Sequence, residues 1–391
     1  MRKMSDTIAR LSALRAQQNV HTPNSTSSNR LSTLNGFGSN PGALQARFYL
    51  PENLPQGAPL VVVLHGCTQN AAAYDHGSGW SKLADQEGFA LLFPEQQRAN
   101  NPNLCFNWFV PADTKRDSGE ALSIRQMIET LVAEHELDRE RIFVTGLSAG
   151  GAMASVMLAT YPDVFAGGAI VAGLAYGTAN TIPEAFDRMR GHGGPSELEL
   201  QRLLRSASPH KGPWPRISIW QGSADQTVAP SNAEAIAGQW RGVHRLGKAP
   251  TRSETVDGHT KRTWSDASGH ALIETRTITG MGHGTPLRTG GEDGLGVPRP
   301  FMLDVGISST RRIAEFWGIA DPSSSASVKP RQPRRDEELP AGSGMFSLAD
   351  DTRMSSRTTP LQEPAPTRPA AEATGVKKII EDALRAAGLM R

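Results

Sequence analysis

Short apolar runs alternate with longer mixed segments through the middle of the chain, from about residue 39 to residue 320. The runs that are apolar or β-branched predict strands at 46–50, 60–64, 89–93, 142–145, 169–172 and 217–220. Residues 251–280, interrupted by Gly258 and Gly269, predict antiparallel strands, and 309–317 predicts a final helix. This alternation indicates an α/β fold in which a mostly parallel central sheet is flanked by helices.

A further helix is predicted to begin near Asp117. This residue stands three positions before Glu120, which is the spacing of a capping box at a helix start. The positions that follow give the predicted helix an apolar side: Leu122, Met127, Ile128, Leu131 and Val132.

The two ends of the chain differ from its middle. Residues 1–38 predict a polar N-terminal extension, while 321–371 are rich in Pro, Ser, Arg and Glu and predict a disordered linker. Residues 372–391 predict an amphipathic helix, whose apolar stripe is Val376, Ile379, Ile380, Ala383, Leu384 and Ala387. Such a helix either packs on its own domain or binds a partner or an apolar surface, and the sequence leaves both interpretations open.

Residues 146–150, with the sequence GLSAG, lie between a predicted strand and the helix-favouring stretch 152–158. A serine on a tight turn between a strand and a helix is the arrangement that exposes a nucleophile in α/β-hydrolases. The two glycines remove Cβ atoms where the strand and the helix crowd each other. Ser148 is therefore the candidate nucleophile.

A serine nucleophile needs a base within hydrogen-bonding reach and an acid that orients this base. Asp225 follows the predicted strand 217–220, at the end of the sheet where the serine turn is also expected. His283 follows the strand-like run 275–279 and has small residues on both sides. The chain order Ser148, Asp225, His283 is the order found in α/β-hydrolases.

Other acidic and histidine side chains fit these roles less well. Asp163 follows the helix after the serine and is expected to point away from the site, and Asp187 has no strand before it. His259 and His270 lie in the turn-rich segment and are expected to face solvent.

The negatively charged oxygen that forms during acyl transfer needs N–H donors that are already in place. The backbone N–H of Ala149, directly after the serine, is one candidate. Cys67 offers the second, in the loop 65–69 that follows the strand 60–64. His65 is expected to orient this loop.

Composition and charge exclude other classes of function. The net charge of +2 gives no electrostatic reason to expect nucleic acid. No apolar run reaches the roughly 18–20 residues that span a bilayer, and the N-terminus does not predict a secretory signal. Cys67 and Cys105 are the two cysteines, and no Cys/His cluster predicts a metal site. The predicted chemistry requires no metal or organic cofactor.

Several separate motifs together resemble a known family. They are LHGCTQ at 64–69, GW at 79–80, FPEQ at 93–96, CFNWF at 105–109 and GLSAG at 146–150. This set is similar to the esterase family of poly(3-hydroxybutyrate) depolymerases, type 1 catalytic domain, over about residues 40–318. The resemblance implies an α/β-hydrolase fold and hydrolysis of esters of short-chain polyhydroxyalkanoates. It implies that Ser148 is the nucleophile, Asp225 the acid and His283 the base, with an oxyanion N–H from Cys67.

The resemblance also concerns the surroundings of the site. It implies a disulfide between Cys67 and Cys105, which would anchor the oxyanion loop and would depend on an oxidising compartment. Trp80, Trp108 and Trp220 are candidates for the apolar wall of the acyl site, with packing in the core as the alternative for each.

The chain departs from the secreted depolymerases in two respects. No export signal is predicted, and a disordered segment and a helix take the place of a β-rich polymer-binding domain. The compartment stays open, because the resemblance is to extracellular enzymes while the sequence is equally compatible with the cytoplasm. Soluble oligomers, amorphous polymer and small acyl esters are the expected substrates.

The sequence therefore predicts a serine esterase that cleaves poly(3-hydroxybutyrate) or its oligomers through an acyl-enzyme. One alternative is a carbohydrate esterase of feruloyl or acetyl type. An alternative of another class is a protein that binds polymer granules through the helix predicted at 372–391.

Overall fold

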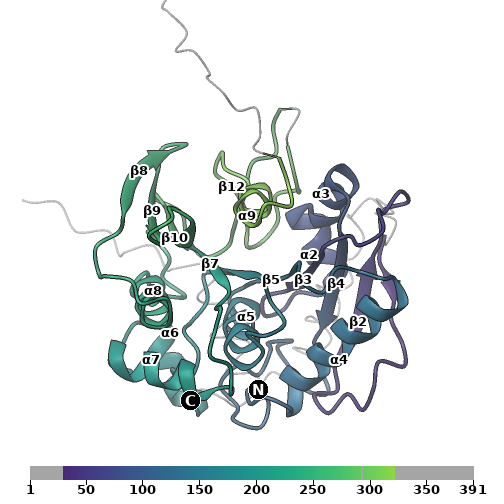
Figure 1. Ribbon diagram of the computed structural model, residues 1–391, viewed down its shortest axis with the longest axis horizontal. Helices are drawn as coiled ribbons and strands as arrows, with labels where there is room; N and C mark the ends of the chain where they lie inside the picture. Colours follow the sequence, from purple (N-terminus) through teal and green to yellow (C-terminus); the bar gives the residue numbers. More distant parts are fainter. Residues whose placement is uncertain (1–29, 292–293, 322–391) are drawn as a thin grey trace, which may run out of the picture.

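The computed structural model describes residues 30–291 and 294–321 (Figure 1). Ten strands form one sheet in the order β1-β2-β4-β3-β5-β6-β7-β10-β9-β8. They are β1 (Ser32–Thr33), β2 (Gln45–Tyr49), β3 (Leu60–Leu64), β4 (Ala90–Glu95), β5 (Ile142–Leu147), β6 (Gly167–Val171), β7 (Arg216–Gly222), β8 (Arg252–Val256), β9 (His259–Ser265) and β10 (Ala271–Ile278). In this order, the six neighbouring strands β4-β3-β5-β6-β7-β10 pair in parallel. Antiparallel strands extend the sheet at both edges.

Helices cover both faces of this sheet (Figure 1). They are α2 (Ala71–Ser78), α3 (Trp80–Glu87), α4 (Gly119–Glu134), α5 (Ala149–Thr160), α6 (Ile182–Met189), α7 (Glu197–Ser206), α8 (Ser231–His244) and α9 (Ser309–Trp317). A small parallel sheet of β11 (Thr285–Leu287) and β12 (Met302–Asp304) lies near α9. No helix of the described ranges is both long and apolar enough to cross a bilayer.

The two faces of the sheet bury separate hydrophobic cores. In β3 the side chains of Val62 and Leu64 join the core under α4, α5 and α8, while Val61 and Val63 join the core under α2, α3 and α9. Successive residues of a strand point to opposite faces, so a run that is apolar throughout is what a strand covered on both faces requires. The predicted α/β class rests on such runs.

The observed elements correct two expectations. The sheet begins before residue 39, because Ser32–Thr33 pairs with β2 and both Leu31 and Leu34 are buried. Within 251–280, β10 pairs antiparallel with β9 as expected but also pairs parallel with β7. The remainder of the predicted 1–38 extension, and the segments predicted at 322–371 and 372–391, lie outside the described residues.

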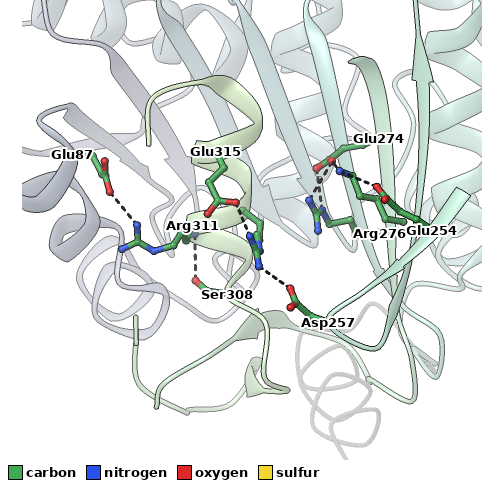
Figure 2. A network of polar contacts seen from close by, with 10 residues as sticks. Glu87, Glu254, Asp257, Glu274, Arg276, Ser308, Arg311 and Glu315 are labelled. Carbon is green, nitrogen blue, oxygen red and sulfur yellow. Dashed lines mark hydrogen bonds and ion pairs between the residues drawn. The ribbon is translucent and has the colours of Figure 1, made fainter. Parts of the chain in front are cut away.

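Ion pairs attach the last helix to both halves of the fold (Figure 2). Arg311 of α9 pairs with Glu87 of α3 at 3.0 Å. Arg312 pairs with Asp257, in the turn between β8 and β9, at 2.9 Å. The helix α9 thus connects α3, in the first part of the chain, to the β8–β9 hairpin at one edge of the sheet.

Candidate active site

Ser148 lies where β5 meets α5, in a backbone conformation with φ 58° and ψ −117°. Its N–H donates to the carbonyl oxygen of Val171 at 2.9 Å. A Cβ at Gly146 would stand 2.3 Å from the carbonyl oxygen of Gly150, and one at Gly150 would stand 2.3 Å from that of Leu64. Both glycines are therefore required by the close approach of strand and helix, and the surrounding structure holds the strained serine turn in place.

Asp225 and His283 come from the loops after β7 and β10, which are neighbouring parallel strands. The distance from His283 Nδ1 to Asp225 Oδ2 is 2.7 Å. Backbone N–H groups of Thr227 and Val228 donate to Asp225 Oδ1 at 2.8 and 2.9 Å. With Nδ1 donating to the aspartate, Nε2 is the ring nitrogen that can accept a proton.

Gln221 also holds this aspartate, and the sequence analysis did not identify it. Its Nε2 donates to Asp225 Oδ2 at 3.1 Å and to the carbonyl oxygen of Val228 at 2.9 Å. The sequence did contain a signal for it, because Gln221 is a polar residue at the end of an apolar strand, and a buried polar side chain needs a hydrogen-bond partner.

The alternative acids do not contact His283. Asp163, after the end of α5, pairs with Arg116 at 2.6 Å. Asp187 is exposed on α6. Neither lines the cavity described next.

Ser148 and His283 line one cavity of about 350 Å³. Trp108 and Phe109 form part of its wall, and Phe301 lies beside His283 with the ring centroids 6.0 Å apart. A further part of the wall is the stripe that α6 presents: Ile182, Ala185, Phe186 and Met189. The sequence analysis did not propose this stripe, although its spacing of i, i+3, i+4 and i+7 is that of an amphipathic helix.

Trp80 and Trp220 lie outside this cavity and match the alternative that the sequence left open for them, packing in the core. Both are buried in the core under α2, α3 and α9, where Trp80 stacks on Trp317 with centroids 6.1 Å apart. Trp220 points to the opposite face of the sheet from its neighbour Ile219, because strand side chains alternate. Trp108 does line the cavity.

The loop after β3 is tied to the segment that carries Trp108. Cys67 and Cys105 form a disulfide with their Cα atoms 4.2 Å apart. Beside the bridge, the N–H of Thr68 donates to the carbonyl oxygen of Asn103 at 2.7 Å. A covalent bond and a backbone hydrogen bond therefore join these two parts of the cavity wall.

The two backbone groups expected to bind an oxyanion face no competing acceptor. Ala149 is the first residue of α5, where an N–H has no partner within the helix. Within the described chain, the N–H groups of Ala149 and Cys67 donate to no other residue. Cys67 also lines the cavity beside Ser148.

His65 is buried behind this loop and does not line the cavity. Its Nδ1 donates to the carbonyl oxygen of Gly66 at 2.8 Å, and its Nε2 accepts the N–H of Gln96 at 3.1 Å. Burial lowers the pKa of His65 to about 4, so the ring is neutral at pH 7. Among the described residues, no group of three or more His, Cys, Asp or Glu side chains is arranged to hold a metal ion.

Comparison with known proteins identifies the family. The family model for Esterase PHB depolymerase matches residues 44–262. The chain belongs to this family. The esterase is 45% identical over 315 residues to poly(3-hydroxyalkanoate) depolymerase C of Paucimonas lemoignei, with 80% of this chain and 76% of the relative covered.

Carbohydrate esterases are also related. The esterase is 32% identical to an acetylxylan esterase of Coprinopsis cinerea, over 66% of this chain and 70% of that protein. The structure of an acetyl xylan esterase from Aspergillus awamori matches with a TM-score of 0.63 and 24% identity, over 74% of this chain and 99% of that one. The Aspergillus structure confirms the α/β-hydrolase fold, and the family match with the relative at 45% identity confirms a carboxylic ester hydrolase.

Proposed function

We propose that this esterase hydrolyses ester bonds of short-chain polyhydroxyalkanoates, such as poly(3-hydroxybutyrate) and its oligomers, through an acyl-enzyme on Ser148. The observation that carries the proposal is the Asp225–His283 hydrogen bond of 2.7 Å beside a cavity that His283 shares with Ser148. The loops from which the two side chains come follow neighbouring strands, so the pair is held in place before substrate binds.

The chemical steps follow from these positions. His283 Nε2 takes the proton of Ser148 as the oxygen attacks the ester carbonyl, and Asp225 stabilises the imidazolium. The N–H groups of Cys67 and Ala149 bind the oxyanion, each worth on the order of 3 kcal/mol of barrier. His283 then protonates the leaving alcohol and activates the water that releases the acid.

Two observations favour a polyester over a sugar ester. The relative with 45% identity is named a polyhydroxyalkanoate depolymerase, whereas the acetylxylan esterase is 32% identical. The apolar side chains of Phe186 and Met189 line the cavity, and such a wall suits the methyl groups of a 3-hydroxybutyrate chain. A sugar ring would need polar partners in their place.

A substrate panel with Ser148→Ala tests the proposal. We expect wild type to cleave 3-hydroxybutyrate oligomers and p-nitrophenyl butyrate faster than feruloyl esters or acetylated xylose, and Ser148→Ala to lose all of these activities. Ser155→Ala is the matched control, because Ser155 is buried in the same helix and does not line the cavity. Hydrolysis by Ser148→Ala at the wild-type rate would reject the mechanism. Cleavage of the carbohydrate esters by wild type faster than of the 3-hydroxybutyrate oligomers would reject the proposed substrate.

Attachment to polymer granules through 372–391 is a separate proposal, supported by the apolar stripe of that segment. A chain ending at Asp321 should bind polyhydroxybutyrate granules more weakly than the full chain while keeping its activity on soluble esters. Equal granule binding by the two chains would reject this attachment.

A further inference from the structure

Glu120 is a fully buried carboxyl group that the proposed mechanism does not use. It is the second residue of α4 and has 0% of its surface exposed. Another buried carboxylate, Glu274, pairs with Arg276 at 3.2 Å (Figure 2). Glu120 forms no ion pair with any residue that the structure describes, and burial raises its pKa to about 8. A buried, unpaired carboxyl group is costly, so its position requires an explanation.

The side chain of Glu120 does not close the capping box that the sequence predicted. The helix begins after Ser118, whose side chain makes no capping hydrogen bond. Glu120 Oε2 instead accepts the backbone N–H of Asn107 at 2.9 Å. Its Oε1 accepts Nε2 of Gln96 at 2.6 Å and Nδ2 of Asn100 at 3.3 Å. The carboxyl group thus binds two separate parts of the loop between β4 and α4, of which Asn107 lines the cavity.

One of these contacts continues to the oxyanion loop. The backbone N–H of Gln96 donates to Nε2 of His65, and Nδ1 of His65 donates to the carbonyl oxygen of Gly66, next to Cys67. The amide of Gln96 also donates to the carbonyl oxygen of Cys105 at 3.0 Å. Glu120 and Gln96 therefore contact the chain near both ends of the disulfide.

The backbone around Glu120 leaves it little freedom to move. A Cβ at Gly42 would stand 2.5 Å from the Cα of Glu120, so another segment of backbone packs directly against it. Gly119 has φ 50°, and a Cβ there would stand 2.4 Å from the carbonyl oxygen of Ala112. The N–H of Glu120 donates to Asp113 Oδ1 at 3.2 Å. The position of the carboxyl group is consequently fixed relative to the loop that it contacts.

We propose that Glu120 is a positioning residue for ester hydrolysis, which sets the oxyanion N–H of Cys67 and the wall at Asn107 and Trp108 relative to Ser148. This inference rests on the proposed function of that site. Glu120 itself touches no substrate, because it lies behind the loops and does not line the cavity. Loss of its contacts should affect the transition state, which needs the oxyanion donors, more than the binding of the ester.

The test compares Glu120→Gln and Glu120→Ala with wild type and with Glu129→Gln. Glutamine keeps the shape of the side chain but turns one acceptor into a donor, which opposes either Asn107 N–H or the Gln96 amide. Glu129 is the matched control, because it lies on the same helix, pairs with Arg139 at 2.9 Å and does not line the cavity. Rates are normalised to active sites titrated with an organophosphate, so that unfolded protein is not counted.

We expect kcat on p-nitrophenyl butyrate to fall about tenfold in Glu120→Gln and more in Glu120→Ala, with KM within about twofold of wild type. The Ki of butylboronic acid, which forms a tetrahedral adduct on the serine, should rise in proportion to the loss of kcat. Glu129→Gln should match wild type in both measurements.

An unchanged kcat and boronate Ki in titrated Glu120→Gln would overturn the proposal, even if the variant were less stable. A rise in KM alone would also overturn it, since that would indicate a role in substrate binding. If Glu120→Ala does not fold, the isosteric glutamine variant still decides the matter. Failure of the proposed function would appear separately, as an organophosphate that does not inactivate wild type.

Discussion

The two sides of the catalytic cavity are held in place in different ways. On the side of the base, Asp225 is fixed by the N–H groups of Thr227 and Val228 and by Gln221, all within four residues of it. On the side of the oxyanion loop, Cys67 is joined to Cys105 across 38 residues of sequence. Local hydrogen bonds thus fix the aspartate that holds His283, whereas a long-range covalent bond fixes the loop that carries Cys67.

This difference indicates where each side is vulnerable. The base side should fail when one carboxylate loses its ability to accept hydrogen bonds, without much change in the fold. The oxyanion side should fail when the loops separate, and its loss should appear as a loss of stability together with activity. Four changes test this comparison. They are given in order of the expected change in the free energy of activation or of unfolding, from the largest to the smallest.

Asp225→Asn should have the largest effect, a loss of about 10⁴-fold in kcat on p-nitrophenyl butyrate. An amide beside Nδ1 of His283 favours the wrong tautomer, so Nε2 can no longer take the serine proton. The fold should be retained, because backbone N–H donors still reach Oδ1. Asp163→Asn is the control, and an equal loss in that variant would contradict the assignment of the acid.

Removal of the disulfide should destabilise the oxyanion side. In the chain-entropy account, a bridge that closes a loop of this length contributes about 4 kcal/mol to the free energy of unfolding. We expect a lower urea midpoint for Cys67→Ala/Cys105→Ala, and the same shift for wild type treated with dithiothreitol. Reductant should leave the double variant unchanged. A reduced wild type with an unaltered midpoint would show that the other contacts suffice.

Acid should destabilise the oxyanion side through His65. Burial lowers its pKa from 6.5 to about 4, so the unfolded chain binds the proton more readily. The contribution of His65 is complete above pH 6.5 and is lost as the pH falls towards 4, about 3 kcal/mol in all. Glu120 acts in the opposite sense, because its raised pKa makes stability fall as the pH rises from 4.5 to about 8.

A variant of His65 tests the acid-side trend. Between pH 6.5 and 4 the free energy of unfolding, measured by urea titration, should fall less in His65→Gln than in wild type. His244→Gln is the matched control, since burial also lowers the pKa of His244 to about 4 but His244 does not line the cavity. It should share the altered slope and keep full activity. A His65→Gln slope equal to that of wild type would contradict the assignment.

Phe186→Ala should have the smallest effect and should concern the wall between the two sides. Loss of this ring removes apolar contact from longer acyl chains, so KM for p-nitrophenyl hexanoate should rise about tenfold while KM for the acetate stays nearly constant. Asp187→Ala, on the exposed side of α6, should change neither value. An equal change for both esters would indicate that the helix does not contact the acyl chain.

The sequence predicted those features that depend on neighbouring residues. Apolar runs gave the strands to within about two residues, since a strand covered on both faces must be apolar throughout. The serine turn was equally accessible, because Gly146 and Gly150 are required locally. Asp225 and His283 were proposed from the chain order of strands and loops that is typical of α/β-hydrolases, and the structure places their side chains 2.7 Å apart.

Contacts between distant segments were not predictable in this way. The sequence placed Glu120 in a capping box, whereas packing against Gly42 directs it to Gln96 and Asn107. The sequence could not decide between the cavity and the core for Trp220, because the direction of a strand side chain depends on register, which composition does not reveal. The structure of the cavity wall depends on such contacts between distant segments.

The direct pairing of β7 with β10 has a consequence for how this enzyme can be altered. Asp225 and His283 are 58 residues apart in sequence, and the chain between them leaves the two strands, forms α8 and the β8–β9 hairpin, and returns. The length of this intervening segment can change without moving the side chain of Asp225 or of His283. The turn at 266–270, where Gly269 faces open space, is therefore a suitable point for grafting a polymer-binding module.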